Sequence, residues 1–190
     1  MFFTIFSCSC CRKQKNISES LPEYRLLTSF SKKISPHTGL IISSYGINNN
    51  LPKEYQFKNG VANFTVTYSL HKQKQDEISI EYARNLLISL THNLLEEINS
   101  NSEIRSHLDA YPLSADLLRI TIRFKDENKI DLGQGIATVY LSNGKIEYEG
   151  YEIHEYTGTY PASGKHFTIH KETYEQALDI VQKNGALVLF

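Results

Sequence analysis

The sequence predicts a mixed α+β fold: an antiparallel sheet with a long amphipathic helix and a C-terminal helix packed on one face. Three observations support this class. Residues 61–71 and 117–125 alternate apolar and polar side chains, as half-buried strands do. Apolar residues between 80 and 98 recur at spacings of three and four, as in an amphipathic helix. The dipeptide Asn143-Gly144 divides a third alternating segment, which is typical of a tight hairpin.

The composition of the 190-residue chain is that of one ordinary domain, or one domain with a tail. Hydrophobic residues make up 41% of the chain and charged residues 22%, so a sizeable core can form. Twenty basic and twenty-one acidic residues give a net charge of −1, whereas nucleic-acid-binding proteins usually carry a basic excess. We therefore expect no nucleic-acid partner. No apolar run reaches the roughly 18 residues that a membrane-spanning helix needs.

The chain is expected to have three parts. Residues 1–11 are apolar and rich in cysteine, and they form a candidate membrane anchor. Residues 12–35 are rich in Lys, Ser, Asn and Glu, and we interpret them as a linker because they offer little surface to bury. Residues 36–190 form a single α+β domain, which begins with a short strand near residues 40–47.

Capping residues set the expected ends of the helices. Ser79 is the expected N-cap of the long helix, and Asn99-Ser100-Asn101 is its expected end. Ser102 is expected to cap a shorter helix that ends before Pro112. A last helix is expected from Tyr174 to Val181, with Asn184-Gly185 as its C-cap.

The hairpin at Asn143-Gly144 has a predicted register. A two-residue turn pairs Ser142 with Lys145 and Val139 with Tyr148, which puts the apolar side chains on one face. Phe167 and Ile169 suggest a further strand, and the apolar end ALVLF (186–190) is predicted to be a buried strand. The order of elements is compatible with a ferredoxin-like sandwich carrying an extra hairpin, or with a cystatin-like sheet wrapped around the long helix.

All three cysteines of the chain lie close together in FSCSCCRKQK. The stretch Ile5-Phe6-Ser7-Cys8 resembles the end of a bacterial lipoprotein signal, in which a small residue precedes the modified cysteine. It departs from that pattern because the apolar region is short and no Lys or Arg precedes it. The cluster Cys8, Cys10 and Cys11, followed by basic residues, also resembles palmitoylated anchors on the cytoplasmic side of a membrane.

The physical chemistry of acylation is consistent with either kind of anchor. Each buried methylene contributes about 0.8 kcal/mol, and stable attachment usually takes two signals. Two acyl chains would supply them, as would one chain together with Arg12, Lys13 and Lys15 near anionic headgroups. The alternative is a plain tail with reduced thiols. C-x-C-C lacks the second ligand pair of a structural zinc site, so no metal is expected there.

The loop and strand around residues 151–170 supply the candidate ligand-binding residues. Tyr151, His154, Tyr156 and His166 could form an amphipathic rim around a small molecule. His166 and His170 are expected to share one face of an extended strand, about 13 Å apart, which is too far for one metal ion. No sequence motif indicates a cofactor or a catalytic residue.

Opposite charges are expected to pair across the polar face of the sheet. Glu147 and Glu149 lie on one predicted strand, and Arg119 and Arg123 lie on another. Such residues also occur in acid–base catalysis, but cross-strand pairing explains them more simply. DENKIDLG (126–133) is interpreted as a plain turn, because Ile130 occupies a position at which a calcium loop needs an oxygen ligand.

The resulting functional hypothesis is a membrane-tethered, non-enzymatic binding domain of unknown partner, peripherally attached through its N-terminus. The alternative is a soluble small-molecule-binding protein or enzyme that uses the loop at 151–170. Neither hypothesis follows from the fold class, because one fold supports many functions.

Overall fold

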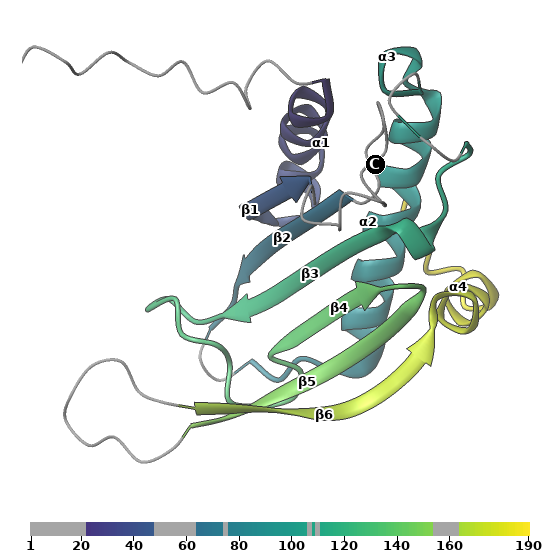
Figure 1. Cartoon of the computed structure of the whole chain (residues 1–190). Coiled ribbons are helices and arrows are strands. Elements are labelled where there is room, and N and C mark those ends of the chain that lie inside the picture. Colours follow the sequence, from purple (N-terminus) through teal and green to yellow (C-terminus); the bar gives the residue numbers. More distant parts are fainter. Residues whose placement is uncertain (1–21, 48–63, 74–75, 106–107, 109–110, 154–163) are drawn as a thin grey trace, which may run out of the picture.

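The computed structural model describes residues 22–47, 64–73, 76–105, 108, 111–153 and 164–190. These residues form a six-stranded sheet in which the strands lie side by side in chain order, from β1 to β6 (Figure 1). The elements are α1 (Pro22–Thr38), β1 (Ile41–Ile47), β2 (Phe64–His71), α2 (Ile80–Ser100), α3 (Ser102–Arg105), the short 3-10 helix η3 (Ala115–Leu117), β3 (Leu118–Lys125), β4 (Thr138–Ser142), β5 (Lys145–Ile153), β6 (Gly164–Thr173) and α4 (Tyr174–Lys183).

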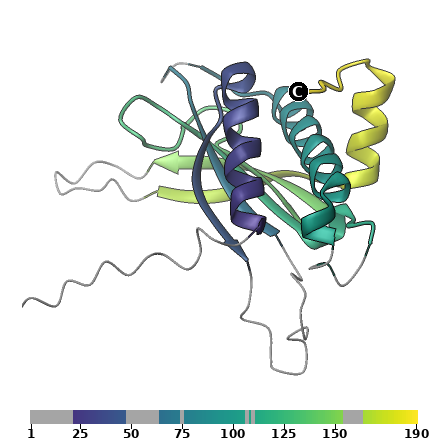
Figure 2. The same ribbon diagram turned by 90° about the horizontal axis from the view of Figure 1, so that it is seen from above.

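The predicted α+β class, with helices packed on one face of a sheet, is confirmed. Helices α1, α2 and α4 lie side by side over one face (Figure 2), and among the described residues no helix covers the other face. We call the uncovered side the open face. The sheet is mixed, because β2 and β3 pair in parallel while the other four neighbouring pairs are antiparallel.

The parallel pair follows from the long helix between its strands. Parallel neighbours need a crossover connection, and α2 supplies it between β2 and β3. A ferredoxin-like sandwich would place another strand between these two, but here they pair directly. The strands follow one another across the sheet in chain order, and α2 packs on them. This arrangement agrees with the cystatin-like alternative, except that one pair of strands is parallel.

Helix α1 corrects the linker predicted over residues 12–35. From Pro22 onward the chain is helical, and Leu26, Leu27, Phe30 and Ile34 enter the core at spacings of one, three and four. Serine and lysine residues between these positions, and a proline near each end of the helix, obscured the pattern in the sequence. Proline is tolerated in the first turn of a helix, so Pro22 can begin α1. Among the described residues the fold therefore includes α1, and residues 22–35 are not a linker.

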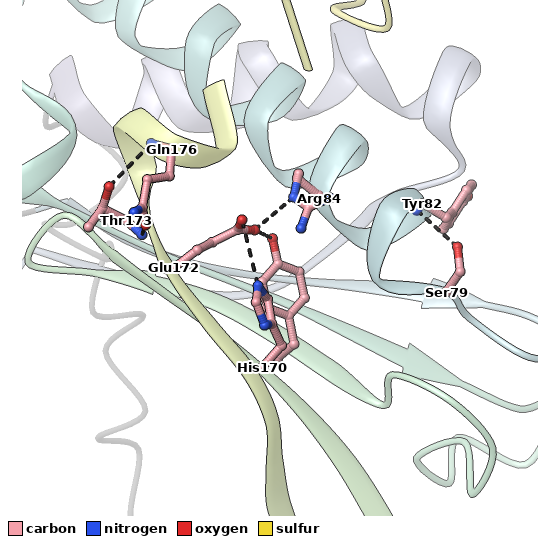
Figure 3. A network of polar contacts seen from close by, with 8 residues as sticks. Ser79, Tyr82, Arg84, His170, Glu172, Thr173 and Gln176 are labelled. Atoms are coloured by element: carbon pink, nitrogen blue, oxygen red, sulfur yellow. Dashed lines mark hydrogen bonds and ion pairs between the residues drawn. The ribbon is translucent and has the colours of Figure 1, made fainter. Parts of the chain in front are cut away.

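Two side chains define the ends of α2. The hydroxyl of Ser79 accepts a hydrogen bond from the Tyr82 N–H at 3.1 Å, which confirms the predicted N-cap (Figure 3). At the other end Asn101 is the C-cap, and its N–H donates to the Ile98 carbonyl at 3.2 Å. The Asn101 side chain also accepts from the N–H of Glu103, so Asn101, and not Ser102, caps α3.

The β4–β5 hairpin forms in the predicted register. Ser142 pairs with Lys145 and Val139 pairs with Tyr148. Asn143 and Gly144 have φ values of 51° and 69°, as a type I′ turn requires. The apolar side chains of both strands are consequently buried beneath the helices.

The segment Ala186–Phe190 is not the buried strand that the sequence suggested. It has no regular secondary structure, and Leu189 is 67% exposed. The segment instead runs alongside α2, and Ser89 and Asn93 of that helix form hydrogen bonds with its main chain. These two polar helix residues supply the hydrogen bonds that a neighbouring strand would otherwise provide.

Candidate functional site

A β-bulge in β6 places His166 and His170 on opposite faces of the sheet. His166 pairs with Tyr151 of β5, and His170 pairs with Tyr148, with a register shift between these two pairs. Tyr148 lies in the core under the helices, whereas Tyr151, three residues away, lies on the open face. The expectation that the two histidines share a face is wrong, because one extra residue reverses the alternation of a strand.

On the open face, His166 lies between two carboxylates. Its Nε2 is 3.4 Å from Asp131 Oδ2, and its Nδ1 is 3.6 Å from Glu149 Oε2. Arg123 also donates a hydrogen bond to Asp131 Oδ2, and the side chain of Asp131 is only 6% exposed. The ring of Tyr151 lies over His166, with 5.0 Å between the ring centroids. We call these five residues the open-face cluster.

The open-face cluster and the adjacent Thr138 contain buried polar atoms that lack a hydrogen-bond partner among the described residues. They are Asp131 Oδ1 and His166 Nδ1, together with Oγ1 of the buried Thr138, which lies between Arg123 and Glu149 in the register of the sheet. Buried polar atoms in native proteins are nearly always hydrogen-bonded, and each exception calls for an explanation. An additional polar group bound here would satisfy them once a small shift of the side chains opened these atoms to it.

The turn after β3 brings Asp131 into the cluster. Asp126 Oδ1 accepts hydrogen bonds from the N–H groups of Asn128 and Ile130, both at 2.9 Å. The chain thereby reverses, and Asp131 pairs with Lys125 next to the end of β3. The segment is the turn that the sequence indicated, and it adds a buried carboxylate to the open face.

A second polar cluster lies on the helix side of the same two strands. Glu172 of β6 accepts a hydrogen bond from Arg84 Nε of α2 at 2.8 Å (Figure 3). The Tyr148 hydroxyl donates to the same oxygen, Oε1. The other oxygen, Oε2, is 3.7 Å from His170 Nε2. The Glu172 side chain is 6% exposed. We call these four residues the helix-side cluster.

Two members of the helix-side cluster, Tyr148 and Arg84, have shifted pKa values that favour one charge state. Burial raises the pKa of the Tyr148 hydroxyl, and the hydrogen bond to Glu172 raises it further, so this tyrosine stays a neutral donor. Burial opposes the charge on Arg84, but the hydrogen bond and the negative charge of Glu172 outweigh burial and raise the pKa of Arg84. A charged, hydrogen-bonded pair thus joins α2 to β6, which is a structural role.

The structure brings together two of the four predicted ligand-binding residues, Tyr151 and His166. His154 and Tyr156 lie outside the described residues, as do the candidate lipidation sites Cys8, Cys10 and Cys11. Among the residues that the structure describes, no group of His, Cys, Asp and Glu is arranged to hold a metal ion.

The expected charge pairing across the open face occurs with different partners. Glu147 pairs with Lys171 of the neighbouring strand at 2.7 Å, and Arg123 pairs with Asp131. The hydrogen bond from Lys171 lowers the pKa of Glu147, with a further contribution from Tyr140. Sequence reasoning missed Asp131, because its place depends on the turn that reverses the chain after β3.

Arg84 and Glu172 were also missed. Arg84 borders the apolar stripe of α2, a position at which a charged side chain usually reaches solvent. Glu172 stands at the end of β6, where the bulge determines which way it points. The only sequence signal for either residue is a charge beside an otherwise apolar stripe.

Comparison with known proteins does not place the chain in a family. No protein family matches it, no curated protein matches its sequence, and no solved structure matches it. No helix among the described residues is long and apolar enough to cross a membrane. The function must therefore be argued from the geometry of the site and the chemistry of the sequence.

Proposed function

We propose that this chain is a binding domain that recognises a partner on the open face of its sheet and that is held at a membrane by acyl chains on Cys8, Cys10 and Cys11. The observation that supports the recognition surface is the open-face cluster, with its buried polar atoms that lack partners among the described residues. A bound partner would complete these hydrogen bonds, and it would gain more from them than from similar bonds in water.

The surroundings of the cluster suit a polar partner. Side chains of β3 on this face are half-buried and include Arg119, Thr121 and Arg123. The partly exposed Tyr151 adds a rigid aromatic surface with a hydroxyl, a combination that is enriched at protein interfaces. Charges of both signs next to an aromatic ring favour recognition of a polar, partly charged surface over a purely apolar one.

The tether rests on the order of residues at the start of the chain. Three cysteines within four positions follow an apolar stretch and precede Arg12, Lys13 and Lys15. Acyl chains would insert among lipid tails while the basic residues remain near anionic headgroups, which supplies the two signals that stable attachment needs.

The tether is tested by membrane fractionation and by mass spectrometry of the natively expressed protein. We expect the wild type to sediment with membranes and to carry fatty acyl mass, and the variant Cys8→Ser, Cys10→Ser, Cys11→Ser to move to the supernatant. Free thiols on a wild-type protein that stays in the supernatant would contradict the tether and leave the recognition surface to be judged separately.

The recognition surface is tested by quantitative affinity purification from native cells. His166→Ala removes the centre of the open-face cluster. His92→Ala on α2 is a matched control, because the two histidine side chains are exposed to a similar extent, 34% and 30%. We expect a partner that the wild type and His92→Ala retain and that His166→Ala loses. Identical retention by all three proteins would contradict recognition at this face.

A second candidate function is binding or conversion of a small molecule at the same cluster. It is favoured by the position of His166 between two carboxylates and under Tyr151, since such groups can move a proton to or from a ligand. Native mass spectrometry of gently purified protein separates the two candidates. A bound small molecule that His166→Ala loses favours this second function, whereas a bound protein favours the first.

A further inference from the structure

Helix α2 carries a ladder of polar side chains at a spacing of four residues: Asn85, Ser89 and Asn93. This spacing places all three on one side of the helix. The ladder lies on the helix layer of the fold, so it belongs to a different surface from the open-face cluster. Ser89 and Asn93 are buried.

Two members of the ladder bind peptide groups. Ser89 Oγ accepts from the Val188 N–H at 3.0 Å. Asn93 binds an extended main chain through both atoms of its amide: Nδ2 donates to the Val188 carbonyl at 2.8 Å, and Oδ1 accepts from the Phe190 N–H at 2.9 Å. This side of α2 is therefore built to bind amide groups.

Asn85, the third member, lies beside a cavity. Its Oδ1 is buried and has no hydrogen-bond partner among the described residues. The cavity has a volume of about 240 Å³ and lies between the end of α1, the first half of α2 and the segment 186–190. Its walls are mainly apolar, with Leu86, Val188 and Phe190 among them, and they include no Lys, Arg, Asp or Glu. Phe190 in turn stacks on His37, with 6.4 Å between the ring centroids.

We propose that this cavity binds a small, uncharged apolar molecule that carries an amide group, and that the half-buried Asn85 side chain turns toward the cavity so that its Oδ1, which is closed to solvent in the free protein, accepts from the amide N–H. Asn93 shows the same chemistry two turns further along the helix. A buried acceptor without a donor is unfavourable, so a ligand with an N–H gains more than one without it. The walls include His37 but no Lys, Arg, Asp or Glu side chain to pair with a charged ligand, which favours a neutral one.

The volume limits the size of the ligand. Typical small-molecule sites begin at about 300 Å³, and this cavity is slightly smaller. It suits a short acyl amide, and it is too small to enclose a long acyl chain completely.

The proposal is tested with two probes on the isotope-labelled full chain, by nuclear magnetic resonance. Hexanamide carries the N–H donor, and methyl hexanoate has a similar shape without it. We expect saturable shifts of the backbone amides of Leu86, Val188 and Phe190 with hexanamide, and an affinity for the ester that is lower by about fivefold or more, the ratio that one hydrogen bond of about 1 kcal/mol gives. No saturable shift at these residues, or equal affinity for both probes, would overturn the proposal.

Three variants sharpen the test. In Asn85→Leu the new side chain has a similar size but no hydrogen-bond acceptor, so we expect this variant to bind both probes equally. Leu86→Trp fills the cavity and is expected to bind neither. His92→Ala, on the same helix but away from the cavity walls, should keep the wild-type affinities. If Leu86→Trp fails to fold, Asn85→Leu decides alone: an unchanged preference for the amide in that variant refutes the role of Asn85.

Discussion

The two faces of strands β5 and β6 carry similar side chains in different environments. The helix-side cluster and the open-face cluster each contain an arginine, a carboxylate whose side chain is 6% exposed, a tyrosine and a histidine. On the helix side both oxygens of Glu172 have polar neighbours. On the open face Asp131 Oδ1 has no hydrogen-bond partner among the described residues.

The difference indicates a division of roles between the two faces. A fully satisfied polar network inside a protein fixes one arrangement of its elements, and here it joins α2 to β6. A network that is incomplete within its own chain has hydrogen-bonding capacity left for another molecule. The same residue types thus serve the fold on one side of the sheet and, in our proposal, recognition on the other.

The largest effect is expected from Glu172→Leu in the helix-side cluster. The substitution leaves the largely buried charge of Arg84 without its carboxylate, and removing one partner of a buried pair typically costs about 3 kcal/mol or more. We expect a loss of this size in the free energy of unfolding, measured by urea denaturation.

The double variant Arg84→Met, Glu172→Leu is the control for that prediction. It removes both charges and leaves apolar side chains of comparable size, so it should recover the part of the lost stability that the unpaired Arg84 charge causes, while the Tyr148 hydroxyl stays without its acceptor. A double variant as unstable as the single one would show that the cost does not come from the Arg84 charge, and the helix-side cluster would then not be the electrostatic link that we infer.

Deletion of Ile169 tests the bulge that separates the two clusters. Without the extra residue, β6 becomes a regular strand in which His166 and His170 lie three positions apart, so they should stay on opposite faces and the ring contact between Tyr151 and His166 should remain. We expect a loss of no more than about 2 kcal/mol in stability, together with a retained nuclear Overhauser effect between the two rings.

Ile169→Ala is the matched control for the deletion. It keeps the number of residues in β6, and Ile169 is largely exposed, so the change should alter stability by no more than about 0.5 kcal/mol. Loss of the ring contact in the deletion variant, with Ile169→Ala unchanged, would mean that Ile169 is not the extra residue of the bulge.

The sequence predicted the elements whose signals are local. The hairpin at Asn143-Gly144 formed in its expected register, because turn chemistry and apolar alternation agree there. The cap at Ser79 was likewise predictable, since its hydrogen bond lies within one turn. Helix α1 was not, because its burial depends on α2 and on strands that are distant in sequence.

The candidate site was only partly predictable for the same reason. The sequence pointed to Tyr151 and His166 because both lie in a segment rich in Tyr and His, and the pairing of β5 with β6 brings them together. Asp131 joins them only because a turn reverses the chain. The placement of His166 and His170 on opposite faces requires a bulge that no residue type in β6 indicates. Bulges and turn positions depend on the partner strand, which a single sequence does not display.

Asp131→Asn on the open face should affect binding more than stability. Asp131 pairs with Arg123, whose side chain is partly exposed, and solvent weakens such pairs to about 1 kcal/mol or less. We therefore expect a loss of no more than about 1 kcal/mol in urea denaturation, with loss of the partner in affinity purification. If Asp131→Asn proved as destabilising as Glu172→Leu, the two clusters would have the same structural role and the comparison would fail.

The smallest effect is expected from the ion pair between Glu147 and Lys171, at the rim of the open face. The hydrogen bond from Lys171 lowers the pKa of Glu147 below its ordinary value of 4.5. A carboxylate with a lowered pKa stabilises the fold fully above that ordinary value, and the contribution disappears as the pH falls through the folded-state pKa. Because Lys171 is largely exposed, we expect the ion pair to contribute about 0.5 kcal/mol to the free energy of unfolding at neutral pH.

Lys171→Gln should therefore be less stable than the wild type near pH 7 and equally stable near pH 2, as measured by urea denaturation across this range. If the two proteins still differed in the free energy of unfolding near pH 2, the effect would come from packing of the lysine stem. The contact between Glu147 and Lys171 would then not be an electrostatic one, unlike the pair between Arg84 and Glu172.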